Sequence, residues 1–340
     1  MESILVLTHV DEGNSALTKA SLEAVTAGLD LASRLNAPLT IGIVAPDPKN
    51  LSESLPPARL LAVSGEAFAQ PRYSTDAAAC EALGRAAAAS IVLIPSSARF
   101  ARVAAGVAHR LGGFIDTHIT AIGGTDTVEA SRWFYRQRVE AVLTRDARPW
   151  FLLLDAGTHT AFAGAPGSAQ VEQIAVNLPT IRTTVSGIRA PMHDQQTIRP
   201  DAKLLLVAGA GWTKKQVDGQ IHAVEAGELI LGFLRASGAS LGSSKSLVDQ
   251  RGEDQPILPF LTHLNQVGQT GATPRHPKGL STCCHGEEPH VVGWRFIAER
   301  RAISLDPNCG WTRGKADVVY VADAFQVMPK VNALLAAKKP

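Results

Sequence analysis

The sequence has few cysteines, few aromatic residues, no long apolar run and no excess of either charge. Four cysteines, two of them adjacent, cannot build the disulfide framework of a small secreted protein. Lys and Arg total 33 against 31 Asp and Glu, so no basic surface for nucleic acid is indicated. The apolar runs are much shorter than the stretch of about 20 residues that a membrane-spanning helix needs. We therefore expect neither nucleic-acid binding nor membrane insertion.

The beginning of the chain has no targeting pattern. Met1 leads directly into the apolar run 4–7, without the features of a signal peptide or an Arg-rich transit sequence. A bacterial protein that works in the cytoplasm is the simplest prediction from this pattern.

The 340 residues, 45% of them hydrophobic, are enough for two globular domains. In the first half, continuous apolar runs alternate with Ala- and Leu-rich helical runs. Strands are predicted at 2–10, 39–45, 59–63 and 90–95, and helices at 16–35, 76–89 and 99–111. Continuous apolar strands between helices are typical of a parallel sheet covered on both faces. Further strands are predicted at 133–142 and 150–154.

A weakly periodic connector, with one strand at 181–186, follows the first half. A second α/β unit then begins with a strand at 203–211 and a helix at 223–236. It ends with a strand at 317–321 and a helix at 322–335. The fold class is therefore predicted as two α/β domains with parallel sheets, at residues 1–200 and 201–340.

Four polar or glycine-containing segments of the second domain carry the functional argument. The first, 242–249, places small hydroxyl side chains and Lys245 where they can contact an anion or a ring edge. The second, 265–271, has two glycines that allow close approach of the backbone to a ligand. The third is the segment 283–290. The fourth combines 303–307 with 319–330.

In this order and spacing, the four segments resemble the FAD domain of electron transfer flavoprotein alpha subunits. The letters Gln-Val-Gly-Gln-Thr-Gly at 266–271 match the family motif completely, and 321–329 is similar to its closing motif. The strand at 91–95 and the helix at 101–111 also fall where the family has them. The resemblance implies an adenine-nucleotide-alpha-hydrolase-like N-terminal domain, which contacts a beta subunit, and an FAD-binding C-terminal domain.

The resemblance also implies the cofactor-binding residues. Those expected at the flavin ring and its ribityl chain are Ser244, Lys245, Val267, Gly268, Gln269, Thr270 and His290. Gly286 is expected in the loop around the ribityl chain and the pyrophosphate, and Ser304, Asp323 and Ala324 near adenosine. His285, next to Gly286, is also expected to bind the cofactor. A cation and a hydrogen-bond donor beside the ring would stabilise negative charge on reduced flavin, which favours one-electron transfer.

Several positions depart from the family pattern. Lys245 stands where the family has an arginine. A second family arginine, after the first strand of this domain, is missing. Lys214 or Lys215 could replace it only if its side chain reached around to the same position. Glu287 and Glu288 place two acids beside a phosphate-binding loop. Adjacent cysteines at 283 and 284 rarely bind one metal ion together, so no metal site is expected.

Two functions of different class follow. The first is an electron carrier without substrate chemistry of its own. It would bind FAD as a heterodimer with a beta subunit, and pass electrons from a dehydrogenase to a quinone-linked or other oxidoreductase. The alternative is a non-redox or altered nucleotide-binding subunit of the same fold, with weak or no flavin binding.

Overall fold

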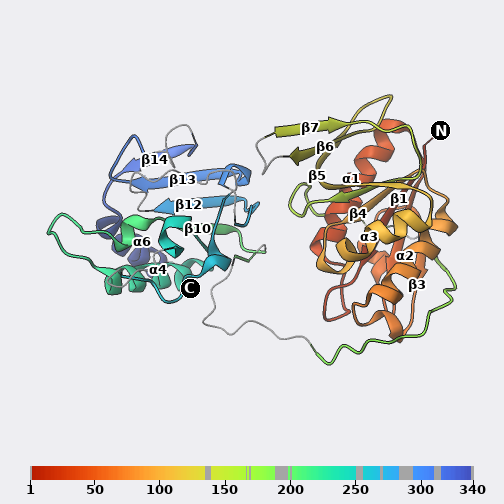
Figure 1. Ribbon diagram of the computed structural model, residues 1–340, viewed down its shortest axis with the longest axis horizontal. Helices are drawn as coiled ribbons and strands as arrows, with labels where there is room; N and C mark the ends of the chain where they lie inside the picture. The colour runs from red at the N-terminus through yellow and green to blue at the C-terminus, as the bar shows by residue number, and fades with distance from the viewer. Residues whose placement is uncertain are drawn as a thin grey trace. The chain divides into compact units, whose positions relative to one another are not determined.

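The computed structural model describes residues 2–134, 139–165, 167, 170–187, 198–199, 201–249, 256–268, 271–282, 294–309 and 315–337 (Figure 1). The chain divides into two compact units, residues 1–189 (unit 1) and 190–340 (unit 2). Within the described part of the chain, no helix combines the length and the apolarity needed to span a membrane.

Unit 1 alternates strands and helices in its first half and adds strands in its second. Its elements are β1 (Ile4–His9), α1 (Lys19–Leu35), β2 (Leu39–Val44), η1 (Leu51–Ser54), β3 (Arg59–Val63), η2 (Glu66–Phe68), α2 (Tyr73–Ala87), β4 (Ile91–Pro95), α3 (Ala98–Arg110), β5 (Phe114–Gly123), β6 (Glu129–Phe134), β7 (Val139–Leu143), β8 (Trp150–Leu154) and β9 (Val171–Gln173). They form one sheet with the order β7-β6-β5-β8-β4-β1-β2-β3-β9.

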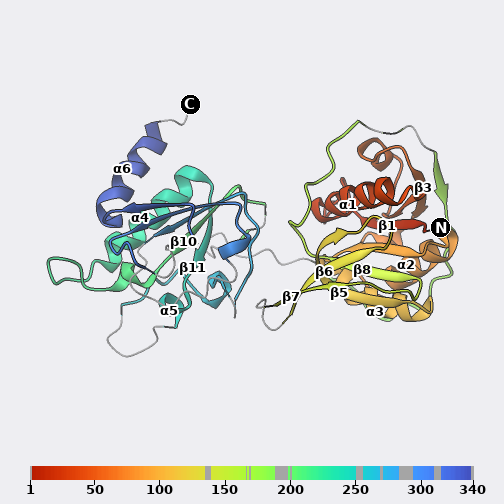
Figure 2. The same ribbon diagram turned by 90° about the horizontal axis from the view of Figure 1, so that it is seen from above.

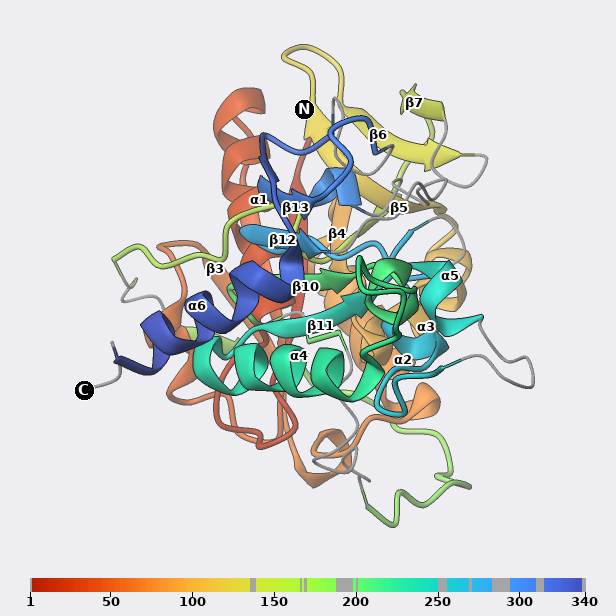
Figure 3. The same cartoon turned by 90° about the vertical axis from the view of Figure 1, so that its left-hand side faces the viewer.

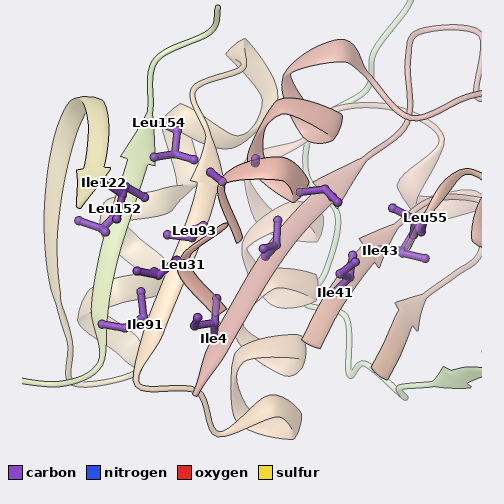
Figure 4. Close-up of a cluster of buried hydrophobic side chains, with 14 of the residues drawn as sticks. Ile4, Leu31, Ile41, Ile43, Leu55, Ile91, Leu93, Ile122, Leu152 and Leu154 are labelled. Carbon is purple, nitrogen blue, oxygen red and sulfur yellow. The ribbon is translucent and has the colours of Figure 1, made fainter. Parts of the chain in front are cut away.

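The central strands of this sheet are buried on both faces. Ile4 and Val6 of β1 pack into the cluster that contains α1, and the intervening Leu5 and Leu7 pack into the cluster that contains α2 and α3. Figure 2 shows α1 on one side of the sheet and the other two helices on the opposite side. Figure 4 shows the α1 side, where Leu31 lies among the apolar side chains of β1, β4 and β8.

Side chains define where the helices of unit 1 begin and end. The hydroxyl of Thr18 accepts a hydrogen bond from the amide of Ser21 at the start of α1, and Ser97 accepts from Phe100 at the start of α3. Asn36 ends α1 in the left-handed conformation (φ 47°) that asparagine tolerates better than most residues. These caps place both helix N-termini beside the carboxyl ends of β1 and β4.

Unit 2 is a smaller parallel sheet with the order β11-β10-β12-β13-β14. Its elements are β10 (Leu204–Ala208), η3 (Ala210–Thr213), α4 (Ala223–Ser237), β11 (Ser240–Ser243), α5 (Lys245–Val248), η4 (His263–Asn265), β12 (Lys278–Thr282), η5 (Trp294–Phe296), β13 (Glu299–Ser304), β14 (Val318–Val321) and α6 (Ala324–Ala337). Helices α4 and α6 pack on one face of this sheet (Figure 3). Val267 and Trp294 belong to the separate apolar cluster on the other face.

The predicted α/β fold class is confirmed, with one correction. Strands β5, β6 and β7 pair antiparallel, so the sheet of unit 1 is mixed rather than parallel. The strand predicted at 133–142 instead corresponds to the end of β6 and most of β7, which pair with each other in antiparallel orientation. The strand predicted at 181–186 is also wrong, because the connector contributes β9 at 171–173 and 181–186 is not a strand.

Candidate functional site

The described site residues of unit 2 follow the carboxyl ends of its parallel strands. Ser244 follows β11, Ser304 ends β13, and Asp323 comes two residues after β14. The connection from β10 runs outward to β11, and the chain then returns past β10 to β12. This reversal makes the β10–β12 boundary a topological switch point, and open α/β sheets bind ligands outside the carboxyl ends at such a point.

The segment 265–268 packs closely against the last residues of β11. The amide of Val267 donates to the carbonyl of Ser243 (3.0 Å), and the side-chain amide of Asn265 donates to the carbonyl of Leu241 (3.1 Å). Gly242 permits this approach, because a Cβ there would lie 2.7 Å from a methyl group of Val267. The absence of a side chain at Gly242 thus allows the segment 265–268 to lie directly against β11.

Both glycines of the motif 266–271 are required by the backbone. Gly268 has a φ of 125°, which L side chains rarely adopt. A Cβ at Gly271 would lie 2.2 Å from the carbonyl oxygen of Gln266. The amide of Ala272 donates to this same carbonyl (2.7 Å), which closes a tight loop. Gln269 and Thr270, the two predicted site residues between these glycines in sequence, lie outside the described residues.

Lys245 lies directly after the N-cap of the short helix α5. Its ammonium group forms an ion pair with the carboxylate of Asp249 on the next turn, and 41% of its side chain is exposed. The hydroxyl of Ser244 accepts from the amide of Leu247, so the helix start is fixed. The charge of Lys245 is therefore held at the β11 end of the carboxyl edge.

The hydroxyl of Ser243 is a second polar group at this end of the edge. It is fully buried, and it finds no hydrogen-bond partner among the residues that the structure describes. A buried hydroxyl without a partner costs free energy unless another polar group satisfies it. Its position fits a site that receives a polar ligand.

The other end of the carboxyl edge contains a cavity of about 260 Å³. Ser304, Asp323 and Ala324, the three residues predicted near adenosine, all line it. One carboxylate oxygen of Asp323 accepts from the amide of Phe325 (2.9 Å) and caps α6. The buried hydroxyl of Ser304 donates to the carbonyl of Asp306. The structure therefore brings together three residues that lie up to 20 positions apart in sequence.

The cavity lining also includes residues that were not among the predicted cofactor-binding residues, although Lys215 is one of the two lysines named above as substitutes for the missing arginine. Gly211 and Lys215 follow β10 and line the same cavity as Ser304 and Asp323. Lys215 therefore lies close to the position after β10 where the family has an arginine that this sequence lacks. The indole N–H of Trp212 donates to the hydroxyl of Thr282 (2.9 Å), which ties the exit of β10 to that of β12 at the switch point.

The remaining predicted site residues, His285, Gly286 and His290, lie outside the described residues, as do Cys283, Cys284 and the Glu287–Glu288 pair. Of the four cysteines, Cys80 and Cys309 are described, buried and not disulfide-bonded. Among the residues that the structure covers, no group of three His, Cys, Asp or Glu side chains is placed to hold a metal ion.

Comparison with known proteins gives two matches. The family model described as "Electron transfer flavoprotein domain" matches residues 6–179, slightly more than half of the chain and almost all of unit 1. The electron transfer flavoprotein subunit alpha of Clostridium acetobutylicum is 22% identical over 347 residues, which cover 98% of this chain and 97% of that protein. The first match covers unit 1 alone, whereas the second extends over both units.

Proposed function

Because the chain belongs to the electron transfer flavoprotein family, we propose that it binds FAD along the carboxyl edge of the unit 2 sheet and carries electrons as one half of a heterodimer. Members of the alpha-subunit family are electron-transfer proteins rather than enzymes with a substrate of their own. Bound FAD would supply reversible electron uptake, and the chain would supply the position and the electrostatic environment.

The observation that carries the proposal is the distribution of site residues along one edge. Ser244, Lys245 and the 266–268 segment lie at the β11 end, and Ser304 and Asp323 lie at the β13 and β14 end. Neighbouring strands are about 4.8 Å apart, so these two groups are separated by roughly 14 to 19 Å along the sheet. A dinucleotide with a ring system at one end and adenosine at the other suits two separated groups better than a mononucleotide does.

Each group offers chemistry that suits its part of FAD. The ammonium of Lys245 and the unsatisfied hydroxyl of Ser243 would face a polar ring edge whose negative charge increases on reduction. Asp323 has a second carboxylate oxygen that can accept from a ribose hydroxyl, as acids do in dinucleotide sites. Lys215 would add a cation at the missing arginine position.

The proposed partners are a beta subunit, a dehydrogenase that donates electrons, and an acceptor oxidoreductase. The beta subunit should bury a large surface of unit 1, because obligate heterodimer interfaces exceed about 2,000 Å² in total. Light scattering of the chain expressed alone tests this pairing. A stable, flavin-loaded monomer would contradict it.

The cofactor is tested on the chain purified together with its beta subunit. We expect flavin absorbance bands, and chromatography of the heat-released cofactor should identify FAD. Release of FMN, or of AMP without flavin, would contradict the proposal. The second of these outcomes would instead support the alternative, an altered nucleotide-binding subunit without flavin chemistry.

A further inference from the structure

The carboxylate of Asp249 connects Lys245 with the stretch of chain that leads into the motif 266–271. Asp249 ends α5, and one of its oxygens pairs with the ammonium group of Lys245. The other oxygen lies 3.6 Å from Nδ1 of His263, which is the first residue of η4. One acidic side chain therefore contacts both the segment after β11 and the segment that precedes the motif.

Hydrogen bonds hold the backbone on both sides of this carboxylate. The amide of Asp249 donates to the carbonyl of Lys245 (2.9 Å), which closes the single turn of α5. At η4, Thr262 and Asn265 form a reciprocal cap, in which the side-chain oxygen of Asn265 accepts from the amide of Thr262 (3.0 Å). The fold thus determines where the carboxylate lies.

Lys245 has more conformational freedom than its acidic partner. A lysine carries its charge at the end of a flexible four-carbon chain, whereas an aspartate carboxylate is one methylene away from the backbone. The side chain of Lys245 is 41% exposed, so packing alone does not hold it. The position of the ammonium group therefore depends on the carboxylate that attracts it.

The same ion pair reduces the positive potential that Lys245 supplies. An ammonium and a carboxylate in contact have no net charge together, so their combined field decreases faster with distance than the field of the lysine alone. A ring edge that gains negative charge on reduction is stabilised more by an unpaired cation than by such a pair. The degree to which Lys245 favours reduced flavin therefore depends on Asp249.

We propose that Asp249 is a positioning residue, which holds the ammonium group of Lys245 at the β11 end of the carboxyl edge and, by pairing with it, lowers the reduction potential of the bound flavin. This inference rests on the proposed binding of FAD to unit 2. It assigns a function to a residue outside the predicted cofactor-binding set. Loss of the carboxylate would leave the ammonium unpaired and free to approach the ring, so the potential should rise.

The test is a spectroelectrochemical titration, at one pH, of the chain purified together with its beta subunit. Asp249→Asn and Asp249→Ser remove the charge in two different ways, and Asp249→Glu keeps it. Glu299→Gln is the matched control. Glu299 is also a half-exposed carboxylate shared by two cations, Lys278 (3.6 Å) and Arg301 (2.8 Å), but it lies at the amino end of β13.

We expect both uncharged variants at position 249 to raise the ratio of reduced to oxidised flavin, at a fixed electrode potential, by about threefold or more. Asp249→Glu and Glu299→Gln should stay close to the natural protein. An unchanged or lowered ratio in both uncharged variants would overturn the proposal. A rise of the same size in Glu299→Gln would also overturn it, because the effect would then reflect net charge rather than position.

A second comparison separates positioning from the direct effect of the carboxylate. If Asp249 acts through Lys245, Asp249→Asn should change the ratio much less in a Lys245→Met background than in the natural protein. An equal change in both backgrounds would overturn the positioning role. Absence of flavin from the natural complex would overturn the proposed function together with this inference, whereas a flavin-loaded complex with unchanged potentials would overturn this inference alone.

Discussion

The stability of unit 1 should depend on the protonation of His9. The ring of His9 is 5% exposed, and in its neutral form both nitrogens are satisfied, by Val10 and Ser97. A proton on the ring would break the bond accepted from the Ser97 hydroxyl and place a charge in a buried site, near Arg99. Burial accordingly lowers the pKa of His9 to about 4, against 6.5 for an ordinary histidine.

The sign and size of the effect follow from this difference in pKa. The unfolded chain takes up the proton at higher pH than the folded chain, so acid favours unfolding. The contribution of His9 is complete above its ordinary pKa of 6.5 and is lost as the pH falls toward about 4. Between about pH 7 and about pH 5 the free energy of unfolding should fall by about 2 kcal/mol on account of this one residue.

Urea unfolding of the natural protein and of His9→Gln over this pH range measures the effect. Hydrogen exchange of peptides from β1 and α3 assigns the transition to unit 1. The stability difference between the two proteins should shrink by about 2 kcal/mol toward acid pH, whereas His109→Gln, an exposed change on α3, should keep the natural pH dependence. A pH-independent difference for His9→Gln would refute the reasoning.

Three further changes test the packing and the proposed site. Arg99→Met removes the main partner of the buried Asp76 carboxylate and should lower the free energy of unfolding by about 3 kcal/mol in urea denaturation. Gly271→Ala should reduce flavin content, measured by absorbance, because its Cβ would overlap the loop backbone. Lys245→Met should lower the flavin potential by about 60 mV per electron in a spectroelectrochemical titration if about 1.4 kcal/mol of charge stabilisation is lost. Lys278→Met should leave it unchanged.

The results that would contradict these predictions are distinct. Natural stability of the Arg99 variant would mean that Arg102 and the backbone amide of Arg72 are enough to hold the Asp76 carboxylate. Natural flavin content in the Gly271 variant would show that the loop does not shape the site. A potential shift in the Lys278 variant, whose lysine lies at the amino end of β12, would show that any lost cation acts at long range.

Part of the fold could be predicted because some strands are apolar on both faces. The strands predicted at 59–63 and 150–154 agree with β3 and β8 to the residue, and every side chain of β8 is buried. Strand β5 was not predicted, because its buried residues, Asp116, Ile119 and Ile122, are three positions apart rather than in strict alternation, and because its register shifts around His118, which has a positive φ. Strands β12 and β13 were also not predicted. Their sequences, KGLST and ERRAIS, are largely polar, so their strand conformation depends on pairing with neighbouring strands.

The candidate site was predictable where a motif has a backbone cause. Gly268 and Gly271 are both required by the backbone of a tight loop, so the two glycines of the motif have a structural reason in this chain. The sequence offers Lys214 and Lys215 as alternative substitutes for the missing arginine, and that Lys215 lines the cavity depends on how η3 turns the chain after β10 toward Ser304. The location in the cytoplasm, the individual flavin contacts and the domain boundary at residue 200 stay predictions.

The three residues of β9 have a consequence for how unit 1 can be isolated. They pair in parallel with β3, whose sequence RLLAV would otherwise end the sheet as an open apolar edge that invites association between chains. Arg59 and Glu172 form an ion pair across this boundary (3.0 Å), and Ser64 donates to the side chain of Gln173. A truncated chain that stops after β8 would keep the core but expose this edge, and should aggregate. One that continues past Ile174 should remain monodisperse.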